Sequence, residues 1–128
     1  MYIKIDFDSD EAIYLQIRNQ IIIGIANRKI KLGDALPSVR KMADDVGINM
    51  HTVNKAYSLL RSEGFLSLDR RNGAVVKINI DKTQDRVEIY NAINLILAKA
   101  FCKNIGREEI HTLIDRLYDS YEEELHEQ

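Results

Sequence analysis

The sequence is poor in cysteine and proline and lacks long apolar runs. Cys102 is the single cysteine among the 128 residues, so no disulfide forms within the chain. One proline and 45% hydrophobic residues exclude a collagen-like or disordered chain. The longest apolar run, residues 21–26, is far shorter than the roughly 18 residues that span a bilayer. Residues 1–10 are acidic and lack the basic and apolar regions of a signal peptide, so we expect a cytoplasmic chain with no membrane partner.

The net charge of −2 conceals an asymmetry along the chain. Residues 1–80 carry 12 basic and 9 acidic side chains, a net charge of +3. Residues 81–128 carry 6 basic and 11 acidic side chains, a net charge of −5. The segment 28–77 alone has 10 basic against 5 acidic side chains. A basic half followed by an acidic half favours a nucleic-acid partner for the first half.

Apolar periodicity predicts three helices in the basic half. The first, over 10–27, has an isoleucine at every fourth position, and Asp8, Ser9 or Asp10 would cap its start. A second begins at Pro37 and stops at Gly47, and Asn49 is a natural N-cap for a third over about 50–63. The spacing leaves open whether Ile22 and Ile23 lie in the core or at an interface. The side chains expected inside are Ile13, Ile17, Ile21 and Ile25, then Val39, Met42, Ala43 and Val46, then Val53, Ala56, Tyr57 and Leu60.

A short hairpin is expected after the third helix. Strand candidates lie at 65–68 and 74–80, and the tip over 69–74 contains two arginines and an Asn-Gly turn signal. A helix, a helix–Gly turn–helix pair and a basic hairpin follow one another in the order of a winged helix-turn-helix. In that fold the third helix enters the major groove of DNA, and the hairpin tip, or wing, reaches phosphates or the minor groove.

Residues 81–128 predict two more apolar helices, separated at 104–106. Two helices of this length cannot enclose a core, so their apolar faces need a partner. We expect a second copy of the chain, packed through a two-fold interface that sets two DNA-reading units about one turn of DNA apart. The fold class is therefore mainly α with a small β-hairpin: a winged helix-turn-helix domain over 1–80 and a two-helix dimerisation tail over 81–128. The residues expected at the interface are Ile93, Leu97, Phe101, Ile110, Leu113, Leu117 and Tyr121.

Four segments resemble the GntR family of bacterial transcription regulators, in order and at the family's spacing. They are Ile13-Tyr14-Leu15-Gln16-Ile17, Gly33-Asp34-Ala35-Leu36-Pro37-Ser38-Val39-Arg40, Thr52-Val53-Asn54-Lys55-Ala56-Tyr57, and Leu60 with Glu63-Gly64. The short remainder resembles the YtrA subfamily, whose tail is two helices. The resemblance implies a regulator that binds an operator in double-stranded DNA, more often as a repressor than as an activator.

The resemblance also implies roles for individual residues. Asn49 and Thr52 would contact phosphate, and Met50, His51 and Asn54 would face base edges. Many relatives carry arginine where Met50 or Asn54 stands here, so the operator should differ from theirs. An asparagine pairs with adenine, and a methionine suits a thymine methyl group. The DNA-binding residues so implied are Arg40, Asn49, Met50, His51, Thr52, Asn54, Lys55, Arg70, Arg71 and Gly73.

Other interpretations stay open at the level of sequence. A winged helix that binds a protein instead of DNA would need an apolar outward face on the third helix. That face is polar here and consists of His51, Asn54, Lys55, Ser58 and Arg61. Arg40, His51 and the two wing arginines are also typical of a solvated surface. A small-molecule effector that changes the angle between two DNA-reading units is a further hypothesis, for which no residue pattern identifies a ligand.

No residues predict an enzyme, a cofactor or a metal site. The chain has no phosphate-cradling glycine loop, no paired cysteines and no supported Ser/His/Asp arrangement. His111 lies near Glu108, Glu109 and Asp115, but an exposed acidic helix is the simpler interpretation.

Overall fold

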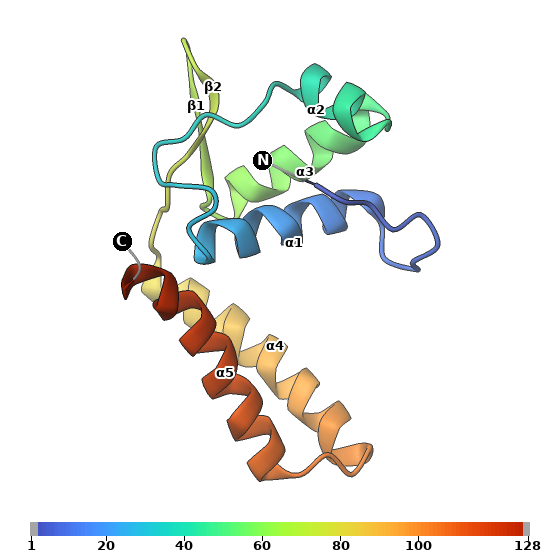
Figure 1. Ribbon diagram of the computed structural model, residues 1–128, viewed down its shortest axis with the longest axis vertical. Helices are drawn as coiled ribbons and strands as arrows, with labels where there is room; N and C mark the ends of the chain where they lie inside the picture. Colours follow the sequence, from blue (N-terminus) through green and yellow to red (C-terminus); the bar gives the residue numbers. More distant parts are fainter. Residues whose placement is uncertain (1–2, 127–128) are drawn as a thin grey trace. The chain divides into compact units, whose positions relative to one another are not determined.

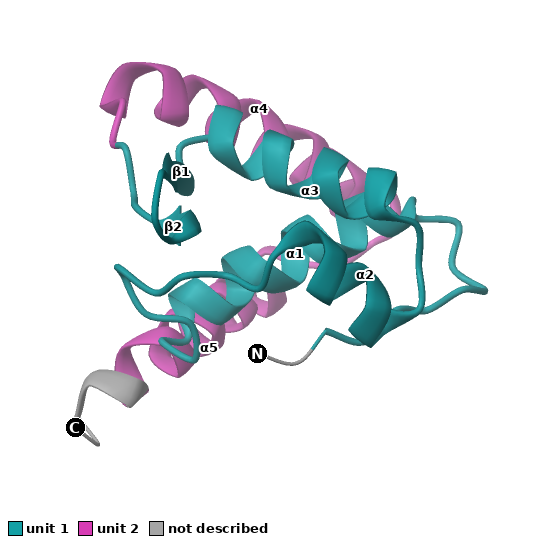
Figure 2. Cartoon of the chain, turned by 90° about the horizontal axis from the view of Figure 1, so that it is seen from above, with its two compact units in different colours: residues 1–79 teal, residues 80–128 magenta. Residues whose placement is uncertain are grey.

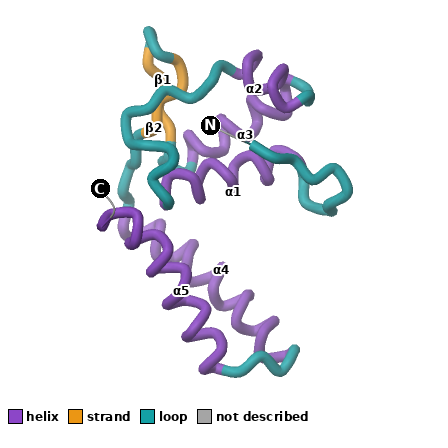
Figure 3. The backbone as a smooth tube through the Cα atoms, viewed as in Figure 1, coloured by secondary structure: helices purple, strands orange, loops and turns teal. Residues whose placement is uncertain are grey.

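The computed structural model describes residues 3–126 and separates the chain into two compact units, residues 1–79 and 80–128 (Figure 2). The side chains are described as far as residue 123. Figure 3 shows that helices dominate and that the strands form one small hairpin. The first unit contains α1 (Ile13–Ala26), α2 (Val39–Val46), α3 (Met50–Ser62), β1 (Leu66–Asp69) and β2 (Gly73–Val76), and the second contains α4 (Lys82–Cys102) and α5 (Arg107–His126).

Helix α3 is the centre of the first unit, where it packs against α1, α2 and β1 (Figure 1). Its predicted inner side chains are all buried, from Val53 to Leu60, and they meet Ile17 and Ile21 of α1. This confirms the inward face predicted for α3. Ile22 packs partly buried against the core, whereas Ile23 is 50% exposed. The inner residues of the first three helices form one cluster with Ile30, Leu36, Leu66 and Val76.

The predicted start of the first helix is wrong. Helix α1 begins after Ala12, and no side chain among the described residues caps it. The Oγ of Ser9 accepts a hydrogen bond from the backbone N–H of Glu11, and the N–H of Asp8 donates to the carboxylate of Asp6. These contacts close local turns ahead of the helix. Asp8, Ser9 and Asp10 therefore belong to a loop that precedes α1.

Two glutamines of α1 hold that loop and the residues before it. The buried side chain of Gln16 accepts a hydrogen bond from the N–H of Asp6 and donates to the carbonyl oxygens of Asp6 and Glu11. One turn later, Gln20 exchanges the same pair of bonds with the backbone of Lys4. The two amide side chains thus bind the N-terminal segment as a neighbouring strand would, an arrangement that periodicity does not reveal.

The turn between α2 and α3 follows its sequence signals closely. Gly47 ends α2 in the left-handed conformation, at φ 79°, and the Oδ1 of Asn49 accepts the N–H of His51 at 2.7 Å. Both predictions are confirmed. The start predicted for the second helix is wrong, because the Oγ of Ser38 caps it and Pro37 lies before the cap.

The hairpin is antiparallel, with Leu66 opposite Val76 and Asp69 opposite Gly73, so its tip consists of residues 70–72. Gly73, at φ 72°, begins β2 and is not part of a two-residue turn. The predicted extension of the second strand to residue 80 is wrong. The N–H groups of Lys77 and Asn79 still donate to the carbonyl oxygens of Phe65 and Gly64, but the strand pairing ends at Leu66 and Val76, because the partner chain leaves α3 only at Gly64.

The second unit does not enclose a core of its own. Both helices and the break over 104–106 are as predicted, and Asp81 caps α4. Ala100 is the one buried residue between 80 and 123. Large apolar side chains lie exposed along both helices, and Phe101 is 84% exposed. No helix within residues 3–126 is long and apolar enough to cross a membrane.

Candidate nucleic-acid interface

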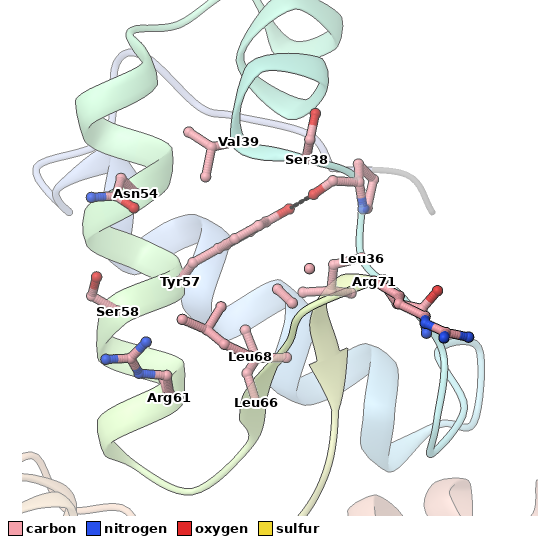
Figure 4. Close-up of a pocket in the computed structure, with 14 residues that line it drawn as sticks. Leu36, Ser38, Val39, Asn54, Tyr57, Ser58, Arg61, Leu66, Leu68 and Arg71 are labelled. Atoms are coloured by element: carbon pink, nitrogen blue, oxygen red, sulfur yellow. Dashed lines mark hydrogen bonds between the residues drawn. The ribbon is translucent and has the colours of Figure 1, made fainter.

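A groove separates α3 from the hairpin, with a volume of about 480 Å³ (Figure 4). Asn54, Ser58 and Arg61 line it from α3, where the spacing i, i+4, i+7 places them on one face. Arg71 lines it from the hairpin tip. We call this feature the α3–hairpin groove, and the apolar residues that line it are Leu36, Pro37, Val39, Leu66, Leu68 and Ala74.

A second hollow lies at the start of α3. It is lined by Val39, Asn49, Met50, His51 and Asn54, and its volume is about 650 Å³. The structure therefore brings together the three side chains predicted to face base edges. The N-terminal residues of a recognition helix are the ones that contact bases in the major groove.

A side-chain hydrogen bond joins the segment before α2 to α3. The hydroxyl of Tyr57 donates to the carbonyl oxygen of Pro37 at 2.7 Å. Burial raises the pKa of this hydroxyl above its ordinary value of 10, so it remains a donor at neutral pH. The bond fixes the start of α2, where the exposed side chain of Arg40 lies.

The hairpin tip is ordered by Asp69. Its carboxylate accepts the backbone N–H of Arg71 at 2.7 Å and that of Asn72 at 3.3 Å. These two bonds lower the pKa of the carboxyl group, because they favour its charged form. The tip presents the side chains of Arg70 and Arg71 to solvent.

Comparison with known proteins decides what kind of molecule carries these features. The family model for bacterial regulatory proteins, gntR family, matches residues 11–76. The chain belongs to the GntR family. The HTH-type transcriptional repressor YtrA of Bacillus subtilis is 38% identical over 118 residues, which cover 90% of this chain and 91% of that protein.

Solved structures agree with this assignment. YtrA from Sulfolobus acidocaldarius, a GntR-family transcription factor, matches with a TM-score of 0.60 and 47% identity, over 72% of this chain and 97% of that one. A transcriptional antiterminator from Listeria monocytogenes EGD-e matches with a TM-score of 0.83 over 94% of this chain and 92% of that one. Its identity of 24% shows a shared fold alone. The chain is thus a DNA-binding transcriptional regulator with a YtrA-like winged helix, and it is not an enzyme.

Within this GntR-family winged helix, the implied DNA-binding residues do not all face the same way. Lys55 lies on the α1 side of α3, where its Nζ is 4.1 Å from the centre of the Tyr14 ring. A cation at this distance from an aromatic face is attracted to the ring. Thr52 is half-buried, whereas Gly73 is exposed. Asn54, one position before Lys55, lines the α3–hairpin groove.

Ion pairs account for some cations of the first unit and leave others available to a ligand. Arg18 pairs with Glu63 at 3.0 Å, and Lys41 with Asp45 at 3.1 Å. Among the side chains that the structure describes, those of residues 3–123, no carboxylate forms an ion pair with the guanidinium groups of Arg40, Arg61, Arg70 or Arg71. These four arginines, which lie on α2, α3 and the hairpin tip, therefore have no ion-pair partner among those side chains.

Sequence reasoning did not assign a DNA-binding role to Arg61 or Leu68. Both line the α3–hairpin groove. The sequence did place Arg61 on the outward face of its helix, but a groove between a helix and a later hairpin is not visible in local spacing. Among the side chains that the structure describes, no group of three or more His, Cys, Asp or Glu residues is placed to hold a metal ion.

Proposed function

We propose that the chain is a homodimeric repressor that binds a two-fold operator through α3 and the wing. The observation that carries this proposal is the exposed polar face of α3, flanked on α2 and on the hairpin tip by arginines that pair with no carboxylate among the described residues. A face of this kind suits a duplex, because side-chain amides read base edges and guanidinium groups bind phosphates. Such a repressor would act in the cytoplasm, where bacterial DNA lies.

In this proposal the start of α3 reads the bases. Met50, His51 and Asn54 share the hollow at the start of the helix and would face the major groove. The amide of Asn54 suits adenine, and the side chain of Met50 suits a thymine methyl group. Asn49 and Thr52 would contact phosphate beside them.

The remaining contacts come from the cations. Arg40, in the first turn of α2, would bind the operator from that helix. Arg70, Arg71 and Gly73 would bring the wing against the backbone or into the adjacent minor groove. Lys55 would contribute less than Arg40, because its cation already interacts with the Tyr14 ring.

Residues 81–128 form the proposed dimerisation tail, and residues 1–80 form the DNA-binding domain. The proposal is supported by the exposed apolar side chains of α4 and α5, since burial of apolar area contributes about 25 cal/mol per Å². A two-fold contact would place the same face of both copies together. The interface residues proposed are Ile93, Leu97, Phe101, Ile110, Leu113, Leu117 and Tyr121. A small-molecule effector would act on this dimer only by binding one arrangement of its two DNA-reading units better than the other.

Sedimentation equilibrium tests whether the tail holds two copies of the chain together. Leu113, 52% exposed, is changed to glutamate, with the same change at its exposed neighbour Thr112 as the matched control. Wild type and Thr112→Glu should sediment as dimers, and Leu113→Glu as a monomer or a much weaker dimer. A wild-type monomer at micromolar concentration would contradict the proposed homodimer.

Selection of bound duplexes from random DNA tests the operator. Selected sites should contain two inverted half-sites whose centres lie about one helical turn apart, or a multiple of it. Footprinting should then protect both half-sites at the same protein concentration. Selection of single, unpaired sites would contradict the two-fold proposal, and recovery of unselected sequence would contradict operator recognition itself.

A further inference from the structure

Among the exposed side chains of the α3–hairpin groove that have no role in the function proposed so far, two are the largest. They are Arg61, in the last turn of α3, and Leu68, on β1. Figure 4 shows Arg61 on α3 and Leu68 beside Leu66 among the residues that line the groove. Neither residue is explained by the core of the first unit, because both side chains are exposed.

Leu68 continues an apolar face out of the core. Alternate residues of a strand share a face, so Leu66 and Leu68 point the same way from β1. Leu66 is 5% exposed within the core, whereas Leu68 is 66% exposed in the groove. The groove therefore has an apolar floor that the protein itself leaves uncovered.

Arg61 stands at the far end of the polar row on α3. It follows Asn54 by seven residues, which is about 10 Å along a helix axis. If the start of α3 lies deep in the major groove, its last turn lies near the edge of that groove, where a sugar–phosphate strand passes. The structure gives Arg61 no carboxylate partner within the described chain.

We propose that the α3–hairpin groove binds the sugar–phosphate backbone of one DNA strand, with Arg61 and Leu68 as additional DNA-binding residues. Arg61 and Arg71 bind phosphates from the two sides of the groove. The hydroxyl of Ser58 donates a hydrogen bond to the same strand, and a deoxyribose packs against Leu68. This proposal rests on the proposed function and extends its contacts to the C-terminal end of α3.

The chemistry of the groove favours this occupant. A nucleic-acid strand alternates anionic phosphates with less polar sugars, and the groove combines cations at its rims with an apolar floor. The alternative role for Arg61 is stabilisation of the helix end, since a cation in the last turn interacts favourably with the helix dipole. The two roles differ in what they do to the salt dependence of DNA binding.

Fluorescence anisotropy tests the proposal with the full chain, a selected operator duplex and a scrambled duplex of equal length. Each protein is titrated at several salt concentrations, and its thermal unfolding is recorded. The variants are Arg61→Ala, Leu68→Ala and the control Lys4→Ala. Lys4 is an exposed cation of the same unit, and its backbone is held by Gln20 of α1.

Each variant has its own expected signature. Arg61→Ala should lower the slope of log affinity against log salt by about one, because a protein that neutralises one phosphate fewer also releases one counterion fewer. It should weaken binding to operator and scrambled duplex by the same factor, since binding to the DNA backbone carries no sequence information. Leu68→Ala should weaken both several-fold with an unchanged slope, and Lys4→Ala should match wild type.

The failures of the two proposals are distinguishable. A wild-type protein that does not prefer the operator overturns the proposed function, and the groove proposal with it. A wild-type protein that prefers the operator, together with Arg61→Ala and Leu68→Ala variants that bind like wild type, overturns the groove proposal alone. A lower melting temperature for Arg61→Ala without a change of salt slope would mean that Arg61 stabilises the end of α3 and does not bind phosphate. This result also overturns the groove proposal.

Discussion

The hydroxyl of Tyr57 donates a 2.7 Å hydrogen bond to the carbonyl oxygen of Pro37 and so joins the middle of α3 to the segment before α2. These residues are twenty positions apart in the chain. The bond satisfies a backbone carbonyl that would otherwise lose its partner. Together with the packing of α2 against α3, it helps to position the start of α2, and hence Arg40, relative to α3.

The variant Tyr57→Phe keeps the ring and removes this donor. We expect it to destabilise the first unit by about 1 kcal/mol, the usual cost of one hydrogen bond in a partly buried place. Urea unfolding at neutral pH measures the change. A variant as stable as wild type would show that water replaces the hydroxyl without cost.

Gly64 lies where two backbone segments come close together. The N–H of Asn79 donates to the carbonyl oxygen of Gly64, and a Cβ on Gly64 would stand 2.8 Å from the carbonyl oxygen of Asn79. Gly47 has a similar φ of 79°, but open space where its Cβ would be. Gly64→Ala should therefore cost at least about 1 kcal/mol more than Gly47→Ala, since both variants are strained by the left-handed conformation and one also meets backbone.

Thermal or urea unfolding of the two glycine variants provides the comparison. Equal destabilisation would mean that the segment containing Asn79 moves aside freely. Gly47→Ala then serves as the measure of conformational strain alone.

The Asp69 carboxylate that orders the wing tip makes the tip sensitive to acid. Two N–H donors lower the pKa of this carboxyl group in the folded protein. The stability that the charged carboxylate contributes to the tip is therefore present above the ordinary pKa of 3.8, and it is lost as the pH falls through the lower pKa of the folded state. The amide proton shifts of Arg71 and Asn72 in an NMR titration should change with a midpoint below 3.8. A midpoint at or above that value would contradict the hydrogen bonds, and Asp69→Asn should abolish this titration.

Arg18 and Glu63 link α1 to the end of α3 through an ion pair whose side chains are 22% and 32% exposed. We expect a double-mutant cycle to give a coupling of about 0.5–1 kcal/mol, at the upper end for such pairs because solvent screens it incompletely. The matched control is the pair of Lys41 and Asp45, 68% and 54% exposed, for which about 0.3 kcal/mol is expected. Equal coupling energies for the two pairs would show that partial burial does not strengthen the ion pair between Arg18 and Glu63.

Local sequence signals predicted most of the first unit. Gly47 as a helix stop and Asn49 as a cap act on the nearest backbone groups, so their roles are readable without the rest of the fold. The inner face of α3 was readable as well, since burial follows the helical period. The predicted start of α2 failed for a local reason, because Ser38 caps the helix and Pro37 lies before it, whereas the start of α1 involves a distant contact. The amide of Gln16, in α1, binds the backbone of Asp6, ten residues earlier, and so holds the loop that precedes the helix.

The candidate site was predictable only in part, for the same reason. The residues at the start of α3 could be named from the family resemblance, and the structure gathers Met50, His51 and Asn54 around one hollow. The stacking of Lys55 on Tyr14 and the groove between Arg61 and Leu68 arise only when separate elements pack together. No spacing within a single element encodes such contacts.

Operator binding by wild type and Arg40→Ala, measured by fluorescence anisotropy across a salt titration, tests sequence-specific DNA recognition most directly. The duplexes are the DNA upstream of the protein's own gene, an operator from the selection, and a scrambled control. We predict preferential operator binding by wild type with a steep salt dependence, and at least a ten-fold loss of affinity for Arg40→Ala, which corresponds to about 1.4 kcal/mol. Equal affinity of wild type for the operator and the scrambled duplex at every salt concentration would contradict sequence-specific DNA recognition.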